Sequence, residues 1–249
     1  MKHLKIIVFS IAVFNLASVK AQTDDSKTFN TAYSIAPIPN IADFFKLNQN
    51  EKFQDSVNLL INKKLDSLPF ADSAEKESGY YGKKDFRNNR SRIFMDSYTN
   101  EKLNPENPEF KLGLPTPCDC FTAHDTMFIY MGIGFFGGFG FNITVSTHNF
   151  QSSFFDYTDD YKPYKYSLSD TASYNYITKK NKYQFLILDK KPSFTIGQQL
   201  TGYLTYTTNS YYQKTSGNNF DNIFVSGKLY FTCKTRQRTP YDILMNKEK

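Results

Sequence analysis

Tryptophan is absent from this chain, whose 249 residues include only three histidines and three cysteines. No HExxH or GxSxG motif occurs, so zinc metalloproteases and nucleophile-elbow hydrolases lack the local sequence on which their chemistry depends. The missing tryptophan also removes the ring that most often provides a sugar-stacking platform. These absences favour a non-enzymatic protein.

The excess of basic over acidic residues is mild. The chain carries 30 basic and 24 acidic residues, and the first 21 residues hold three of the lysines and no acidic residue. The densest basic stretch, residues 83–92, has the composition of a solvated linker. We find no basic run with interleaved aromatic rings of the kind that follows a nucleic-acid backbone, and we therefore exclude nucleic acid as a partner.

Residues 1–21 have the pattern of a secretory signal peptide. Lys2 and Lys5 precede an apolar core over residues 6–17, and Val19-Lys20-Ala21 forms a small-residue cleavage site. The apolar core is too short to span a membrane. We expect a mature chain from Gln22, secreted or periplasmic, without a transmembrane segment. Its many Asn, Lys, Ile, Phe and Tyr residues resemble the composition of exported bacterial proteins.

The longest uncharged stretch after the leader, residues 127–145, favours two strands of a buried β core. Apolar and small or polar residues alternate on both sides of Gly137-Gly138, which is the period of a strand with one buried face. The glycine pair predicts the turn of a hairpin, because glycine reaches positive φ without steric cost. Gly132, Gly134 and Gly140 leave room for large aromatic rings on a neighbouring strand. The stretch contains five glycines, which disfavour a membrane-spanning helix. It also contains a match to GxGxxG, but the dinucleotide-binding motif is followed by a helix, and here a strand pattern follows it.

Residues 22–117 are expected to form a helical and irregular N-terminal extension that ends in a linker. Apolar residues recur at helical spacing from Asn50, a candidate N-cap, to Leu68, and Pro69 ends the pattern. A short turn over residues 41–45 precedes this helix. Residues 70–117 are polar and proline-rich at their end, which favours a long connection with a short helical turn around residues 93–95.

Residues 118–235 predict a mainly β domain, followed by a charged tail over residues 236–249. About eight short strands at regular spacing indicate an antiparallel β-sandwich, Ig-like or jelly-roll, and a small closed β-barrel is the alternative. The polar residues 179–182 predict a hairpin turn between strands over residues 174–178 and 183–188.

The three cysteines, Cys118, Cys120 and Cys233, predict a disulfide between Cys233 and one of the other two. Such a bridge would join distant strands, and oxidising compartments preserve it. The alternative is an exported metal-handling protein, with copper or zinc held by the three cysteines and His124.

Tyrosines crowd one part of the β domain and are our candidate binding residues. They are Tyr157, Tyr161, Tyr164, Tyr166, Tyr174 and Tyr176. Exposed tyrosine is enriched at interfaces, so these side chains favour a non-enzymatic binding or structural module for a protein or glycan partner at the cell surface or in the periplasm. The nearby carboxylates are Asp156, Asp159, Asp160 and Asp170. They give two weaker alternatives, a Ca²⁺ site and a hydrolase.

Overall fold

The computed structural model describes residues 30–45, 89–105, 107–134, 137–159, 163–215 and 217–238. The predicted signal peptide, the predicted helix over residues 50–68 and most of the predicted tail lie outside these residues. Within the described ranges, no helix combines the length and the apolar composition that crossing a membrane requires.

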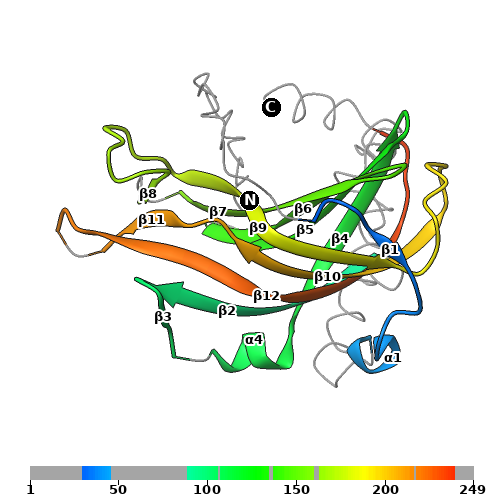
Figure 1. Cartoon of the computed structure of the whole chain (residues 1–249), viewed down its shortest axis with the longest axis horizontal. Coiled ribbons are helices and arrows are strands. Elements are labelled where there is room, and N and C mark those ends of the chain that lie inside the picture. The colour runs from blue at the N-terminus through cyan, green and yellow to red at the C-terminus, as the bar shows by residue number, and fades with distance from the viewer. Residues whose placement is uncertain are drawn as a thin grey trace, which may run out of the picture.

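The described part of the chain is mainly β and forms a closed antiparallel barrel of eight strands (Figure 1). In barrel order the strands are β2 (Arg90–Thr99), β4 (Leu114–Ala123), β5 (Thr126–Gly134), β6 (Gly137–Ser146), β7 (Phe150–Thr158), β9 (Tyr176–Leu188), β10 (Gln199–Thr208) and β12 (Phe220–Lys234). Each strand pairs with the next, and β12 pairs with β2 over ten residues to close the ring. The fold is therefore the closed barrel of the alternative prediction, and the predicted sandwich is wrong.

Short elements extend or cover the barrel. They are β1 (Ser34–Ile35), α1 (Ile41–Phe44), β3 (Lys102–Leu103), α4 (Pro108–Leu112), β8 (Tyr164–Lys165) and β11 (Tyr211–Lys214). β11 pairs with the start of β12, and β8 pairs with β11, so both prolong the wall at one end. β1 lies parallel to β9 on the other side of the barrel. α1 is the short turn that the sequence predicts over residues 41–45.

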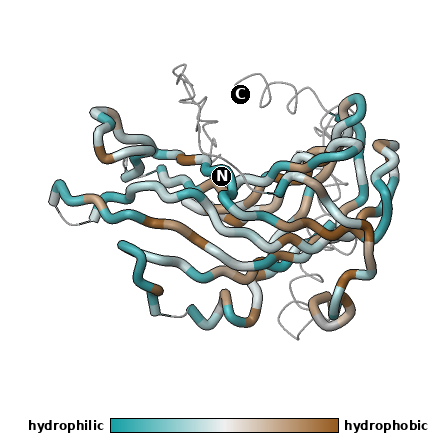
Figure 2. The backbone as a smooth tube through the Cα atoms, in the orientation of Figure 1, coloured by the Kyte–Doolittle hydropathy of each residue, from teal (hydrophilic) through white to brown (hydrophobic). Residues whose placement is uncertain are grey.

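Alternation along the strands places the apolar side chains inside the barrel. In β10, Leu200, Leu204 and Tyr206 are buried, whereas Thr201, Tyr203 and Thr205 are half-buried on the outer face. Figure 2 shows hydrophobic segments along the strands and hydrophilic ones at several loop ends. The burial of each large side chain contributes about 1.5–3 kcal/mol to folding.

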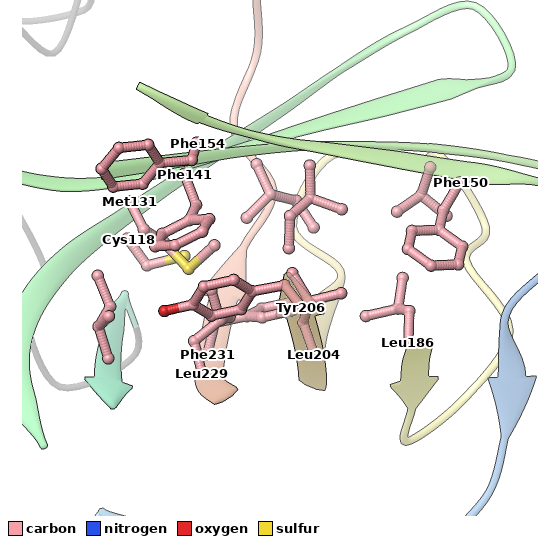
Figure 3. Packing of buried hydrophobic residues seen from close by; sticks show 14 of the residues in the cluster. Cys118, Met131, Phe141, Phe150, Phe154, Leu186, Leu204, Tyr206, Leu229 and Phe231 are labelled. Atoms are coloured by element: carbon pink, nitrogen blue, oxygen red, sulfur yellow. The ribbon is translucent and has the colours of Figure 1, made fainter. Parts of the chain in front are cut away.

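The barrel interior is filled by its own side chains. Phe141 from one wall packs against Tyr206 from the opposite wall, with ring centroids 4.4 Å apart, and Phe154 lies 5.4 Å from Phe141 (Figure 3). Phe231 and Leu204 are fully buried beside them. Eight strands enclose a space that side chains can fill, which is what these residues do.

Gly132 and Gly140 make room for one large ring on a neighbouring strand, as the sequence predicts. A Cβ at Gly140 would collide with the backbone of Met131 and with the ring of Phe155, and one at Gly132 would press on the same ring. Gly137 and Gly138 lie within β6 rather than in the predicted turn, because Gly138 pairs with both neighbouring strands.

Two segments differ from their predicted structure. The predicted hairpin turn over residues 179–182 lies inside the single strand β9, whose residues 176–180 pair with β7 and residues 181–188 with β10. The predicted linker contains the barrel strand β2, which replaces the helical turn expected around residues 93–95. In both segments, pairing on two sides satisfies the backbone and overrides local composition.

Candidate functional site

The outer face of β7 and β9 carries a cluster of aromatic rings that we call the β7–β9 aromatic surface. It consists of Phe155, Tyr157 and Tyr176, with Thr178 and Lys180 continuing along β9. Tyr157 pairs with Tyr176 across the two strands, and the rings of Phe155 and Tyr176 lie 6.2 Å apart at 25°. Tyr176 is 48% exposed. The surface therefore presents nearly parallel rings to solvent.

Glycines on the neighbouring strands lie beside this surface. Phe155 pairs with Gly140 on β6, and the ring of Phe155 lies over the backbone of Gly140 and Gly132. Gly138 stands opposite Tyr157.

A second cluster lies behind the first, on the inner face of the same end of the barrel. Asp156 on β7 accepts hydrogen bonds from the hydroxyl groups of Tyr164 on β8 and Tyr211 on β11, the latter at 3.5 Å. Both tyrosines are buried. Burial raises the pKa of Asp156 to about 6, although these hydrogen bonds and one from the backbone of Tyr157 act to lower it. The carboxyl group thus links β7 to the two short strands that extend the wall.

Of the three remaining predicted tyrosines, two pack against other side chains and one lies outside the described residues. Tyr166 and Tyr174 form an edge-to-face pair with centroids 5.6 Å apart, and the Nζ atom of Lys179 lies 4.9 Å from the centre of the Tyr166 ring. Tyr161 lies outside the described residues. The structure therefore brings together on the outer surface only two of the six predicted tyrosines, Tyr157 and Tyr176.

Buried polar residues of β9 form a group that sequence reasoning missed. Lys179 is 5% exposed and Asn181 is fully buried. The amide nitrogen of Asn181 donates to Ser152 at 2.6 Å, and the side-chain oxygen of Gln184 accepts from the backbone and hydroxyl groups of Ser152 at 2.9 and 2.7 Å. These contacts fix β9 against β7, although the side-chain oxygen of Asn181 is buried without a hydrogen-bond partner. Because these buried residues of β9 are polar, the local sequence predicts a turn and gives no sign of the buried hydrogen bonds.

The cysteines form one disulfide. Cys120 on β4 is bonded to Cys233 on β12 with their Cα atoms 6.1 Å apart, whereas Cys118 is a buried free thiol. Burial and the adjacent carboxylate of Asp119 raise the pKa of the Cys118 thiol. The predicted bridge between Cys233 and one of the other two cysteines is confirmed.

The predicted metal ligands are not gathered into a site. The disulfide takes two of the four, and His124 is exposed in the turn between β4 and β5. Across the part of the chain that the structure describes, no three His, Cys, Asp or Glu side chains are grouped so that they could hold a metal ion.

The candidate carboxylates make different contacts and do not act as one group. Asp156 belongs to the inner cluster, and Asp159 is exposed after β7. Asp170 accepts a hydrogen bond from the backbone of Ser167 at 2.8 Å, which closes a local turn. Asp160 lies outside the described residues.

Comparisons of the chain with protein-family models, with curated proteins and with solved structures give no match. The function therefore has to be inferred from the residues of the chain itself.

Proposed function

We propose that this protein is a non-enzymatic binding module that recognises a glycan or protein partner through the β7–β9 aromatic surface. The observation that supports the proposal best is the nearly parallel pair of Phe155 and Tyr176, with Tyr176 half exposed. Because large side chains fill the barrel interior, we place recognition on the outer surface.

The surroundings of the rings favour a glycan over a protein. Phe155 and Tyr176 offer apolar faces on which sugar rings can stack, and the outward residues beside them are polar: Ser153, Thr178 and Lys180. Hydroxyl and ammonium groups beside a flat aromatic ring suit the alternating apolar and hydroxyl-bearing faces of a sugar chain. A protein partner is the second candidate, because tyrosine is enriched in protein interfaces.

We further propose that the protein acts outside the cytoplasm of a bacterium, secreted or in the periplasm. The leader pattern of residues 1–21 and the disulfide between Cys120 and Cys233 support this location, because disulfides persist in oxidising compartments.

Affinity electrophoresis in gels that contain neutral glucans, galactans, chitin fragments or peptidoglycan fragments tests the glycan proposal. We expect at least one polymer to retard the wild-type protein, and Tyr176→Ala to reduce the retardation about tenfold, since ring–sugar stacking resembles other aromatic contacts in strength. Tyr183→Ala is the matched control, because Tyr183 lies on the same strand and is 52% exposed.

Retardation by none of these polymers would refute the glycan assignment. If Tyr176→Ala and Tyr183→Ala reduced the retardation equally, recognition would have to lie away from the β7–β9 aromatic surface.

A further inference from the structure

β8 is a two-residue strand that ends the sheet, and it extends the barrel wall at one end. The amide of Tyr164 donates to the carbonyl oxygen of Tyr174 at 3.1 Å, and the amide of Tyr174 donates to that of Tyr164 at 2.8 Å. On its other side β8 pairs with β11, where the amide of Lys214 donates to Pro163 at 2.7 Å. A short strand at the end of a sheet opens at a smaller free energy than the core requires. The hydrogen bonds of these three amides therefore report whether β8 is docked.

A single carboxyl group connects β8 to the interior of the barrel. Asp156 on β7 accepts hydrogen bonds from the hydroxyl groups of Tyr164 on β8 and Tyr211 on β11. The rings of the two tyrosines lie edge-to-face with centroids 6.1 Å apart, and both are almost fully buried. Asp156 itself stands opposite Ile177, whose side chain is fully buried. The docking of β8 thus depends on a carboxyl group among apolar and aromatic side chains.

One charged side chain of β9 also lies on the inner face near Asp156. Lys179 stands opposite Phe154, diagonally across from Asp156. Its Nζ atom lies 4.9 Å from the centre of the Tyr166 ring, which attracts the cation. Desolvation nevertheless has the largest effect on the carboxyl group of Asp156, and it disfavours the ionised form.

The proton on Asp156 is linked to the docking of β8. Burial raises the pKa of Asp156 from 3.8 to about 6, although the hydrogen bonds from Tyr164, Tyr211 and the backbone of Tyr157 act to lower it. A carboxyl group that water can reach returns toward its ordinary pKa, so the docked strand holds the proton more tightly than the open strand. Docking is therefore favoured most below about pH 4 and loses this contribution as the pH rises through about 6.

We propose that β8 is a pH-sensitive flap, which stays docked on the barrel end while Asp156 is protonated and opens more often once that carboxyl group ionises. Opening lets water reach the carboxylate, which removes the cost of burying its charge. It also uncovers the buried rings of Tyr164 and Tyr211. The protein thus exposes aromatic side chains at this end of the barrel more often at neutral pH than in acid.

Amide hydrogen exchange of the full chain, followed by NMR, tests the proposal. The observed rates are divided into the intrinsic rates at each pH, which gives protection factors. Between about pH 5 and about pH 8 we expect those of Tyr164, Tyr174 and Lys214 to fall about fivefold to tenfold, because the docked and open strands hold the proton with different pKa values. Low urea should leave these rates unchanged, because a local opening exposes little surface.

Two variants separate the effect of Asp156 from general effects of pH. Asp156→Asn keeps the shape of the side chain but cannot titrate, so the protection factors of the three amides should stay constant over the same pH range. Asp125→Asn is the matched control, because Asp125 is exposed in the turn between β4 and β5. It should show the same fall as the wild-type protein.

The inference goes beyond the proposed function and does not depend on it, because no glycan enters the measurement. Constant protection of the three amides in the wild-type protein would overturn it, and so would the same fall in Asp156→Asn. Exchange of these amides as slow as that of the paired β5–β6 amides would also overturn it, because β8 would then open only when the whole barrel unfolds. The wild-type measurement is decisive by itself if Asp156→Asn fails to fold.

Discussion

Cys120 and Cys233, 113 positions apart, form a disulfide beside the line along which the barrel closes. There the chain that follows β12 meets β4: the backbone of Arg236 donates to the carbonyl oxygen of Cys120 at 2.9 Å. The Arg236 guanidinium also donates to both carboxylate oxygens of Asp119, at 2.8 and 2.6 Å. The covalent bond therefore reinforces a closure that otherwise depends on strand pairing between distant parts of the chain.

Reduction of this disulfide should lower the free energy of unfolding by about 4–5 kcal/mol, the loop-entropy value for a ring of this size. Urea unfolding with and without reductant measures the change. In Cys118→Ala the effect of reductant should persist, and in Cys233→Ser it should vanish. A thiol assay on the denatured, unreduced protein should find one free thiol, and three would show that the bond is absent.

Asp156 should make the stability of the protein depend on pH. Burial raises its pKa from 3.8 to about 6, so the folded chain holds this proton more tightly than the unfolded chain. The stabilisation is complete below about pH 4 and is lost as the pH rises through 6, a change of about 3 kcal/mol. Asp156→Asn cannot titrate, so its stability relative to wild type should rise by about that amount between pH 4 and pH 7.

Urea unfolding of both proteins at intervals between pH 4 and pH 8 measures this difference, and the comparison cancels the other titrating groups. A constant difference between the two proteins across this range would show that Asp156 is not buried in this way.

Gly202→Ala should destabilise the barrel by about 1–3 kcal/mol, the usual cost of inserting an atom into a packed core. Gly202 pairs with Phe231 across β10 and β12, and a Cβ at this position would overlap the Phe231 ring. Thermal and urea unfolding measure the loss. The double variant Gly202→Ala/Phe231→Leu supplies the control, because a smaller side chain at position 231 should make the added methyl less costly. Additive effects of the two substitutions would argue against the contact.

Several strands of the barrel could be predicted from the sequence, whereas the closure could not. Alternation predicted both strands of the β5–β6 hairpin, because each has one apolar face. The strand β2 was missed because it carries apolar side chains on both faces and lies among charged residues: Ile93 is buried inside, and Phe94 packs outside against α1. Pairing of β2 with β12 distinguishes a barrel from a sandwich, and strand spacing carries no information about it.

The site was less predictable than the fold, for a physical reason. Lys179 and Asn181 are polar residues that the barrel buries, and local composition assigns such residues to a turn. Tyr157 and Tyr176 meet because β7 pairs with β9, whereas Tyr164, from the same crowded stretch, turns inward to Asp156. Composition identified the tyrosine-rich region, but only the register separates its outer rings from its inner ones.

The proposed recognition on the outer surface requires a closed barrel, and amide hydrogen exchange tests that closure directly. Along β2, the amides that bond to β12 should exchange as slowly as those between β6 and β7, because both lie inside a continuous sheet. The exposed residues Lys190, Lys191 and Ile196, in the loop between β9 and β10, serve as the fast-exchanging reference. Slow exchange in β2 and β12 is the predicted result, and exchange of the β2 amides at the rate of that loop would contradict the closed barrel.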